Sequence, residues 1–374
     1  GDYYVMYSRA VKEDPSFKEQ AQELLLKWEN DDEETRKLWK KMNSWVLNGF
    51  KETYQRFGVS FDKEYFESLY YTRGKNIVVD GLNNEVFEKD ETGAIIANLE
   101  KEKGKIKLPN KVLLRSDGTS IYITQDMYLA DMRYNDYKYQ QMIYVVASEQ
   151  RLHFQQLFAV LKQLKKSYAD DMYHLSYGLV HLPSGRMKSR EGTVIDADDI
   201  MDETAIIAKK EIKKRHKDLS EKECNSRSEQ ISLGAIKFFM IKTDATRDII
   251  FNPEESMSFE GETGPYIQYT HARICSILRK AEREHQDTVI STINFSLLNL
   301  NEELAILKLL YNFPEVVKKA AEFYKPHHIA QYLISLSQSF NEFYHKCPVI
   351  SEVRGQMKAR LLLIDSVRHV LENG

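Results

Sequence analysis

The sequence predicts an α/β domain built on a parallel sheet, followed by an all-α domain. Between residues 121 and 182, apolar runs typical of strands alternate with helical patterns, which is the order of βαβ units. The run 142–147 is almost continuously apolar, as expected for a strand covered on both faces. After residue 200 the pattern is mostly helical. Only 16 glycines and 8 prolines occur in 374 residues, which favours long helices with few breaks.

Two long helices are expected first, over residues 16–29 and 33–57, because apolar residues recur at helical spacing in both. These apolar residues are Leu24, Leu25 and Trp28, then Leu38, Trp39, Met42, Trp45 and Phe50. The acidic stretch between the two segments suits a hairpin turn with a capping aspartate. The tryptophans are expected in a core.

Short strands punctuated by glycine, proline and lysine are expected within residues 76–125. The predicted strands are 78–79, 95–96, a strand from 112 that ends at the Asp117-Gly118 turn, and 121–124. The next predicted elements are a helix at 126–134, a strand at 142–147, a helix at 150–165 and a strand at 174–182.

The C-terminal part is expected to be helical. Residues 231–264 are predicted to be a connecting helical module, and residues 265–374 a helical domain. In its first helix, Ile267, Ile274 and Leu278 are expected to face the core. A late amphipathic helix is predicted over 327–346. Its apolar stripe consists of Ile329, Leu333, Leu336, Phe340 and Phe343.

The charge balance excludes a dedicated non-specific nucleic-acid binder. Lys and Arg number 53 against 56 Asp and Glu, which gives a net charge of −3, whereas such binders are usually basic. Any contact with nucleic acid must therefore come from local patches. One basic run is Lys209, Lys210, Lys213, Lys214, Arg215 and Lys217. We interpret this run first as a solvated helix end.

The three cysteines, Cys224, Cys275 and Cys347, lie far apart and form no CxxC pair, so neither a zinc nor a redox motif is supported. An odd number of cysteines in a large chain favours a reducing, cytoplasmic location. No run of about 18 apolar residues predicts a membrane span, and no signal-peptide pattern opens the sequence. The sequence begins without methionine and stops just after a helical pattern, so we expect a fragment.

A compact basic loop follows the strand predicted at 174–182. It contains Arg186, Lys188 and Arg190 between Gly185 and Gly192. Clustered guanidinium and ammonium groups neutralise phosphoryl oxygens, so this loop is a candidate phosphate site. A solvated basic turn between two strands is an equally good interpretation of this segment alone.

Residues 185–190 resemble the second signature loop of class I aminoacyl-tRNA synthetases, in the degenerate form of the arginyl enzymes, where Gly-Thr-Val follows as it does here. Arg186 stands at the first signature lysine, and Met187 matches. Lys188 and Ser189 replace the usual serine and second lysine. This departure leaves open which side chain contacts pyrophosphate.

Four further motifs in family order extend the resemblance over nearly the whole chain. They are 115–119 with 122–126, 144–150 with 153–154, 259–266, and 340–344 with 347–349. They are similar to the amino-acid pocket of arginyl-tRNA synthetases, the next strand and helix, the junction into the anticodon domain, and a late helix of that domain. No tetrapeptide like the first signature, His-Ile-Gly-His, occurs in the sequence.

The resemblance therefore implies the C-terminal part of the enzyme: the second half of a Rossmann-like parallel-sheet catalytic domain, followed by a helical-bundle anticodon-binding domain. Residues 1–75 are expected to be a helical segment of the catalytic domain or its insertion. Residues 76–200 are expected to form the catalytic half with an α+β insertion and the signature loop. Residues 201–262 are expected to form a connecting module that contacts the tRNA stem, and residues 263–374 the anticodon-binding domain.

The implied activity is that of an arginine–tRNA ligase. It activates L-arginine with ATP to arginyl-adenylate and transfers the arginyl group to the 3′ end of tRNA(Arg). ATP is expected with Mg²⁺ as a substrate, without a protein-bound metal, and the chain is expected to be a monomer. The alternatives are a non-catalytic tRNA-binding fragment and another class I synthetase. The lack of zinc-ligand cysteines and the Tyr122/Asp126 pair argue against a cysteine enzyme.

A pocket for free arginine needs a carboxylate and neutral oxygens, because a guanidinium has five N–H donors. By the resemblance, Asp126 takes the guanidinium and the Tyr122 hydroxyl assists. Gln150 begins the helix after a parallel strand, where ligands of open α/β sheets bind, and belongs to the same site. Without the resemblance, Asp126 and Gln150 read as helix N-caps and Tyr122 as a core aromatic.

The other site residues also follow from the resemblance. Arg186, Lys188 and Arg190 are expected to stabilise the departing pyrophosphate, so that no protein nucleophile is needed. The ATP-site candidates are His153, His174, Gly178, Met187 and Ser189, although a lone histidine is more often structural. The tRNA-binding candidates are Tyr266, Tyr269, Arg273 and Tyr344. Aromatic side chains interleaved with arginine suit stacking on splayed bases, and helix packing with a surface arginine is the alternative.

Overall fold

The computed structural model describes residues 2–70, 73–100, 107–181, 183, 196–284 and 293–374. The chain divides into two compact units, each described by itself. The α/β unit consists of Phe61–Leu179 and Thr246–Asp248. The helical unit consists of Gly1–Ser60, Val180–Ala245 and Ile249–Gly374.

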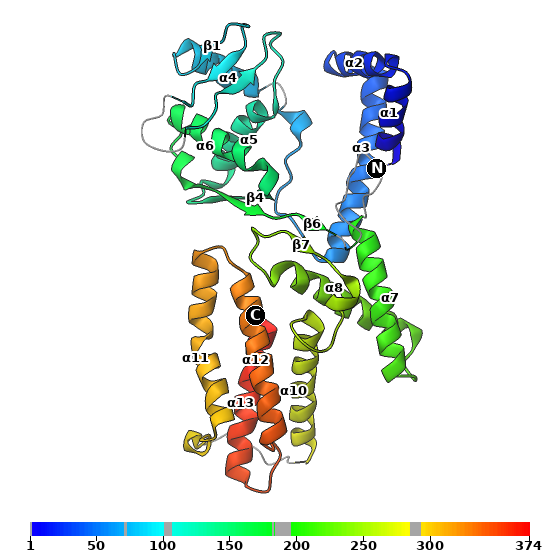
Figure 1. The fold of residues 1–374 in the computed structure, drawn as a ribbon, viewed down its shortest axis with the longest axis vertical. Coiled ribbons are helices and arrows are strands. Elements are labelled where there is room, and N and C mark those ends of the chain that lie inside the picture. The colour runs from blue at the N-terminus through cyan, green and yellow to red at the C-terminus, as the bar shows by residue number, and fades with distance from the viewer. Residues whose placement is uncertain (1, 71–72, 101–106, 182, 184–195, 285–292) are drawn as a thin grey trace. The chain divides into compact units, whose positions relative to one another are not determined.

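Within its described residues, the α/β unit contains two small sheets and three α-helices, as Figure 1 illustrates. Its helices are α4 (Gly74–Asn83), α5 (Tyr122–Tyr137) and α6 (Arg151–Gln163), with 3₁₀ turns at Glu67–Leu69, Ser148–Gln150 and Ala169–Asp171. Its strands are β1 (Glu88–Lys89), β2 (Ile95–Ala97), β3 (Lys111–Leu114), β4 (Met142–Ala147) and β5 (Met172–Tyr177). Strands β1, β2 and β3 pair antiparallel in that order.

Strands β4 and β5 pair in parallel, with Met142 opposite Met172 and Ala147 opposite Tyr177. Helix α6 connects them, so the predicted βαβ order from residue 142 onward is confirmed. The core of this unit joins α5 and α6 to the sheets, and Leu113, Ile123 and Leu157 are fully buried in it. This packing fixes the start of α5 relative to the start of α6, where the arginine-site candidates lie.

Two predicted strands are wrong. Residues 78–79 lie in α4, and residues 122–124 form the first turn of α5. The Thr124 hydroxyl accepts a hydrogen bond from the Ile121 N–H (3.2 Å) and donates one to the Leu113 carbonyl (2.5 Å). The Thr124 side chain therefore caps the start of helix α5. The β-branched residues around it favour a strand by residue type, which is why the sequence predicted one.

The helical unit contains ten α-helices and one short strand pair within its described part. The helices are α1 (Asp2–Glu13), α2 (Ser16–Glu29), α3 (Glu33–Phe57), α7 (Ala197–Arg215), α8 (Glu221–Ile241), α9 (Pro253–Ser256), α10 (Gly264–Glu284), α11 (Asn301–Glu322), α12 (His327–Lys346) and α13 (Arg354–Asn373). Strands β6 (Val180–His181) and β7 (Ile249–Ile250) pair in parallel, and Phe295–Leu297 is a 3₁₀ turn. The predicted bounds of α2, α3 and α12 are confirmed.

Helices α10 to α13 pack side by side around one apolar core (Figure 1). The predicted stripe of α12 is confirmed, because Leu336, Phe340 and Phe343 are fully buried and Ile329 packs against them. Ile267 and Ile274 of α10 are likewise buried in this core. The shared core thus fixes α10 and α12 relative to each other, and with them the residues on their faces that point away from the core.

A buried ion pair joins α11 to α13. Glu303 is fully buried, and its Oε1 accepts from Nε of Arg360 at 2.7 Å. Its Oε2 accepts from the Leu300 N–H at 2.9 Å, and Arg360 donates to the Pro348 carbonyl at 2.7 Å. Each of the two charged groups therefore makes two hydrogen bonds, and such bonds are the condition under which a buried pair is tolerated.

The expectation that the N-terminal tryptophans lie in a core is wrong. Helices α2 and α3 bury none of their residues, and Trp45 is 62% exposed. Trp28 and Trp39 meet edge to face at 5.4 Å instead. The capping aspartate is confirmed, since Asp32 accepts from the Thr35 N–H at 2.9 Å at the start of α3.

No described helix is both long and apolar enough to cross a membrane.

Candidate functional site

The strongest candidate site in the α/β unit is the meeting point of Asp126 and His153. Asp126 lies in α5 and His153 in α6, and Nε2 of the imidazole is 2.7 Å from Oδ2 of the carboxylate. The two side chains are 35% and 17% exposed. An ionised carboxylate can only accept, so the imidazole is the donor. Asp126 is thus an anchored, partly exposed anion and not the N-cap of α5.

Tyr122 and Gln150 lie near the starts of the same two helices. Tyr122 is the first residue of α5, one turn before Asp126 on the same helix face, and it is 80% exposed. The core-aromatic interpretation of Tyr122 is therefore wrong. Gln150 is exposed at the N-cap position of α6, but its side chain makes no capping hydrogen bond. Among the described residues, no hydrogen bond joins either side chain to Asp126.

The surroundings of Asp126 include two tyrosines that stay neutral at physiological pH. Burial raises the pKa of Tyr144 to about 12, and it also raises the pKa of Tyr70. The negative charge of Asp126 adds to both shifts, whereas the positive charge of Arg133 opposes them. The Arg133 guanidinium lies 5.6 Å from the centre of the Tyr144 ring. Asp126 therefore acts electrostatically on two buried, neutral tyrosines.

His174 is held in the sheet. Its Nε2 is 2.9 Å from the Val146 carbonyl on the neighbouring strand, and its ring lies 4.5 Å from that of Phe154. A carbonyl oxygen only accepts, so this imidazole donates across the parallel pair. These contacts favour a structural part for His174 over contact with a nucleotide.

Gly178 is buried where the chain leaves β5. A Cβ added there would lie 2.2 Å from the carbonyl oxygen of Arg247 and 2.5 Å from the backbone nitrogen of Asp248. Next to it, the Leu179 N–H donates to the Asp248 carboxylate at 2.7 Å. Close backbone approach therefore explains this glycine without any nucleotide.

We expect Gly178→Ala to lower the free energy of unfolding by about 1–3 kcal/mol, because the added methyl group overlaps a backbone that cannot move aside. Chemical denaturation of the variant and the unchanged chain measures the difference. Gly49→Ala is the matched control. Its Cβ meets nothing within 4 Å, so alanine should leave stability equal or raise it in α3. Equal stability of the Gly178 variant would contradict the close approach.

The signature-loop candidates Arg186, Met187, Lys188, Ser189 and Arg190 lie outside the described residues.

The four tRNA-binding candidates come together on α10 and α12. Arg273 donates to Asn341 at 2.7 Å and to the Tyr269 hydroxyl at 2.8 Å. Its guanidinium also lies 4.6 Å from the ring centre of Tyr269 and 5.0 Å from that of Tyr344. Asn341 in turn donates to the Tyr266 hydroxyl at 2.9 Å. Arg273 is thus the centre of an aromatic cluster that spans two helices.

Asn341 is a cluster residue that sequence reasoning missed. The signal was present, because Asn341 is the polar residue directly after the buried Phe340 in the motif 340–344. The faces of the cluster differ. Tyr266 packs against the core, as the helix-packing alternative expects, whereas Tyr269 and Tyr344 remain 42% and 40% exposed. The side chains of Tyr269 and Tyr344 are therefore partly accessible to a ligand.

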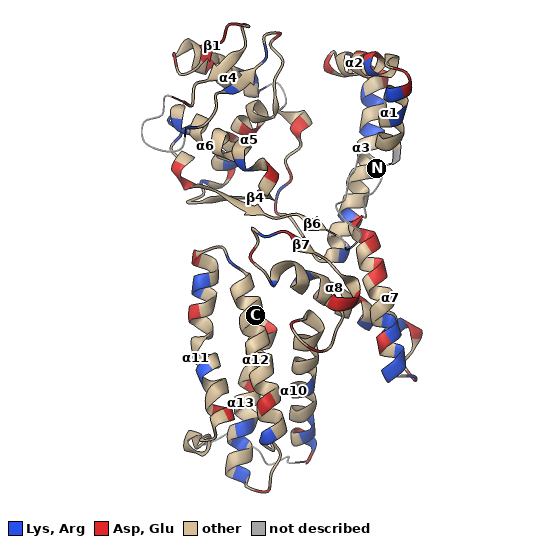
Figure 2. Ribbon diagram, viewed as in Figure 1, with Lys and Arg blue, Asp and Glu red and all other residues tan. Residues whose placement is uncertain are grey.

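In the helical unit, basic residues occur at the end of α7 and in the last turns of α10 (Figure 2). At the end of α7, Lys213 pairs with Glu221 at 3.1 Å, Lys209 pairs with the same carboxylate, and Lys214 pairs with Glu211. These pairs agree with a solvated, largely neutralised helix end. In the last two turns of α10, Arg279, Lys280 and Arg283 are exposed on the helix that carries Arg273, and Lys280 pairs with Glu284 at 3.9 Å.

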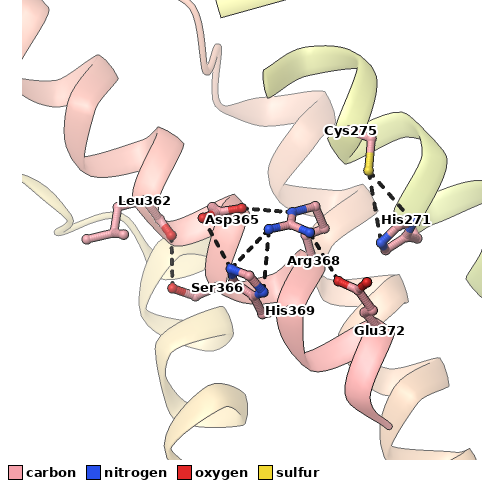
Figure 3. A network of polar contacts seen from close by, with 8 residues as sticks. All are labelled: His271, Cys275, Leu362, Asp365, Ser366, Arg368, His369 and Glu372. Atoms are coloured by element: carbon pink, nitrogen blue, oxygen red, sulfur yellow. Dashed lines mark hydrogen bonds and ion pairs between the residues drawn. The ribbon is translucent and has the colours of Figure 1, made fainter. Parts of the chain in front are cut away.

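Figure 3 shows further polar contacts within α13 and, separately, between His271 and Cys275 of α10. Arg368 donates to Asp365 at 2.8 Å and to Glu372 at 3.1 Å, all within α13. On α10, the Cys275 sulfur lies 3.8 Å from Nδ1 of His271. Across the part of the chain that the structure describes, no group of three His, Cys, Asp or Glu residues could hold a metal ion. We interpret the contacts within α13 as surface ion pairing.

Comparison with known proteins first defines the class. The family model "tRNA synthetases class I (R), catalytic domain" matches residues 1–253, and the model "DALR anticodon binding domain" matches residues 267–374. The fold is therefore that of a class I aminoacyl-tRNA synthetase: a catalytic domain with a parallel sheet, followed by a helical anticodon domain. Because the catalytic-domain match covers most of the chain, the chain belongs to the arginyl-tRNA synthetase family.

Relatives and solved structures agree with this family. The chain is 45% identical over 378 residues to the arginine–tRNA ligase of Treponema denticola, covering 100% of this chain and 63% of that protein. It is 39% identical to that of Parabacteroides distasonis, covering 100% and 65%. The chain thus spans under two thirds of the length of these curated relatives.

Among solved structures, arginyl-tRNA synthetase from Plasmodium falciparum matches with a TM-score of 0.77 at 24% identity, over 96% of this chain and 60% of that one. The Thermus thermophilus arginyl-tRNA synthetase matches with a TM-score of 0.76 at 24% identity, over 98% and 71%. These likenesses show the fold.

Proposed function

We propose that this chain supplies the arginine pocket and the anticodon-binding domain of an arginine–tRNA ligase. The observation that carries the proposal is the Asp126 carboxylate, anchored by His153 on one oxygen and partly exposed. A carboxylate oxygen accepts charge-assisted hydrogen bonds from a guanidinium. Tyr122 and Gln150, near the starts of the same two helices, supply further polar groups for the substrate.

The reaction has two steps. An oxygen of the arginine carboxylate attacks the α-phosphorus of ATP, the bond to the bridging oxygen breaks, and pyrophosphate leaves. A ribose hydroxyl of the terminal adenosine of tRNA(Arg) then attacks the arginyl carbonyl carbon and releases AMP. Neither step needs a protein nucleophile, so catalysis consists of positioning and charge stabilisation. Mg²⁺ enters with ATP as part of the substrate.

The loop cations Arg186, Lys188 and Arg190 have the charge that a leaving pyrophosphate requires. Met187 and Ser189 of the same loop complete the proposed ATP site. The function implies a monomer in the cytoplasm, acting on free arginine, ATP and tRNA(Arg).

For the tRNA, we propose that Tyr269, Tyr344 and Arg273 bind bases of the anticodon loop. Partly exposed aromatic side chains held by an arginine can stack on unpaired bases of any sequence. The exposed Arg279, Lys280 and Arg283 of α10 supply the phosphate attraction that the overall charge of −3 lacks.

A titration tests the arginine pocket directly. Calorimetry with L-arginine and with L-citrulline, its uncharged isostere, is expected to give at least tenfold tighter binding of arginine, because citrulline lacks the charge that Asp126 balances (about 1.4 kcal/mol per tenfold). Equal affinity for the two amino acids would contradict the proposal.

A substitution tests the tRNA surface. Tyr344→Ala is expected to weaken binding of tRNA(Arg) about tenfold, since base stacking on an aromatic side chain contributes about 1–3 kcal/mol. Tyr311→Ala is the matched control, because Tyr311 is 86% exposed on α11 and makes no contact with the cluster. Filter binding at fixed salt measures both. Equal losses for the two variants would contradict a specific role for Tyr344.

A further inference from the structure

We propose that His153 is a positioning residue of the arginine pocket: its Nε2–H holds one oxygen of Asp126 so that the other is kept for the guanidinium of the substrate. This inference rests on the proposed function, in which Asp126 binds that guanidinium. It gives His153 a different part from the nucleotide contact that the family resemblance implies.

The geometry of the pair supports this role. The hydrogen bond joins Nε2 of His153 to Oδ2 of Asp126 at 2.7 Å and bridges α6 to α5 across 27 residues of sequence. The Oδ1 atom makes no hydrogen bond with any residue in the described part of the chain. An aspartate on a helix surface otherwise samples several rotamers. A fixed rotamer removes that ordering cost from substrate binding.

His153 is itself supported from the sheet. Its ring lies 5.4 Å from that of Phe154, edge to face, and Phe154 is buried. The Phe154 ring lies 4.5 Å from that of His174, whose Nε2 is bound to the Val146 carbonyl of β4. A continuous series of contacts thus runs from the parallel strand pair to the carboxylate. The orientation of Asp126 is therefore tied to the parallel strand pair through these contacts.

Two substitutions separate hydrogen bonding from packing. His153→Phe keeps a ring beside Phe154 and removes the N–H, whereas His153→Gln keeps an N–H donor and removes the ring. The arginine affinity of the full chain is measured by calorimetry for the unchanged protein and both variants, with circular dichroism as the check on folding. ATP affinity is measured in parallel.

We expect His153→Phe to weaken arginine binding about 10- to 100-fold, which corresponds to the loss of a hydrogen bond to a charged group. His153→Gln is expected to recover affinity to within a few-fold of the unchanged chain. Neither variant is expected to change ATP affinity. If His153 only packed against its neighbours, the Phe variant would bind arginine more tightly than the Gln variant, because phenylalanine preserves the packing and glutamine does not.

Three results would overturn the inference: unchanged arginine affinity in His153→Phe, weaker binding in the Gln variant than in the Phe variant, or a loss confined to ATP. Failure of the proposed function is distinguishable, because it shows in the unchanged chain as equal affinity for arginine and citrulline. If His153→Phe does not fold, the imidazole ¹⁵N chemical shifts of the unchanged chain decide whether His153 positions Asp126 for arginine. Among its 10 histidines, the His153 signal, assigned with the Gln variant, must show an Nε2–H that responds to arginine and not to ATP.

Discussion

Asp126→Asn is expected to weaken arginine binding at least a hundredfold. The substitution keeps the size of the side chain and the contact with His153, but it removes the negative charge opposite the substrate guanidinium. Leaving one partner of a desolvated ion pair unbalanced costs about 3–5 kcal/mol. Calorimetric titration with L-arginine measures the loss, and affinity for uncharged citrulline should stay nearly constant.

The same helix offers a matched control. Asp136 is an exposed carboxylate in α5 that accepts from the Tyr65 hydroxyl at 2.6 Å. Asp136→Asn makes the same chemical change away from the proposed pocket and should leave arginine affinity unchanged. If Asp126→Asn binds arginine as the unchanged chain does, the assignment of the guanidinium to Asp126 is wrong.

Arg360→Met is expected to lower the free energy of unfolding of the helical unit by about 3–5 kcal/mol, because it leaves a buried carboxylate without its cation. The carboxylate is that of Glu303, whose side chain is 0% solvent-exposed and accepts a 2.7 Å hydrogen bond from Arg360 at its Oε1. Methionine fills similar volume, so lost packing contributes little. Denaturant unfolding followed by circular dichroism measures the change.

A double variant and a surface pair complete this test. Replacing Glu303 and Arg360 together by apolar residues should recover much of the loss, since neither charge then remains alone. Lys27→Met breaks a surface pair with Glu23 at 3.0 Å and should leave stability nearly unchanged. A cost of Arg360→Met no larger than that of Lys27→Met would contradict the buried-pair interpretation.

Helices were predictable from the sequence where apolar residues recur at helical spacing. Residues 16–29, 33–57 and 327–346 have such stripes, and the structure gives helices with these bounds. The stripe does not predict what covers it, because periodicity reports the face of a helix and not its partner. The late helix buries its stripe, whereas the N-terminal pair leaves Trp45 exposed.

The start of α5 shows why local propensity failed. Ile121, Ile123 and Thr124 favour a strand by residue type. The structure makes a helix there because Thr124 bonds the Leu113 carbonyl and Ile123 is fully buried, contacts that depend on residues distant in sequence. Tertiary packing therefore overrides a weak local preference.

The candidate site was predictable in its residues but not in its contacts. The family resemblance supplies Asp126 and Arg273, yet it does not indicate that His153 pairs with the first or that Asn341 holds the second. Both partners lie on other helices, 27 and 68 residues away. Only the packing of α5 with α6, and of α10 with α12, brings them together.

The most direct test of the central claim is a binding titration of the chain with a tRNA(Arg) transcript and with the same transcript carrying a scrambled anticodon loop, at one fixed salt concentration. We predict tighter binding of the native transcript, because in our proposal the cluster around Arg273 binds unpaired bases as well as phosphates. Equal binding of both transcripts would reduce the interaction to general electrostatic attraction and would contradict an anticodon-reading synthetase domain.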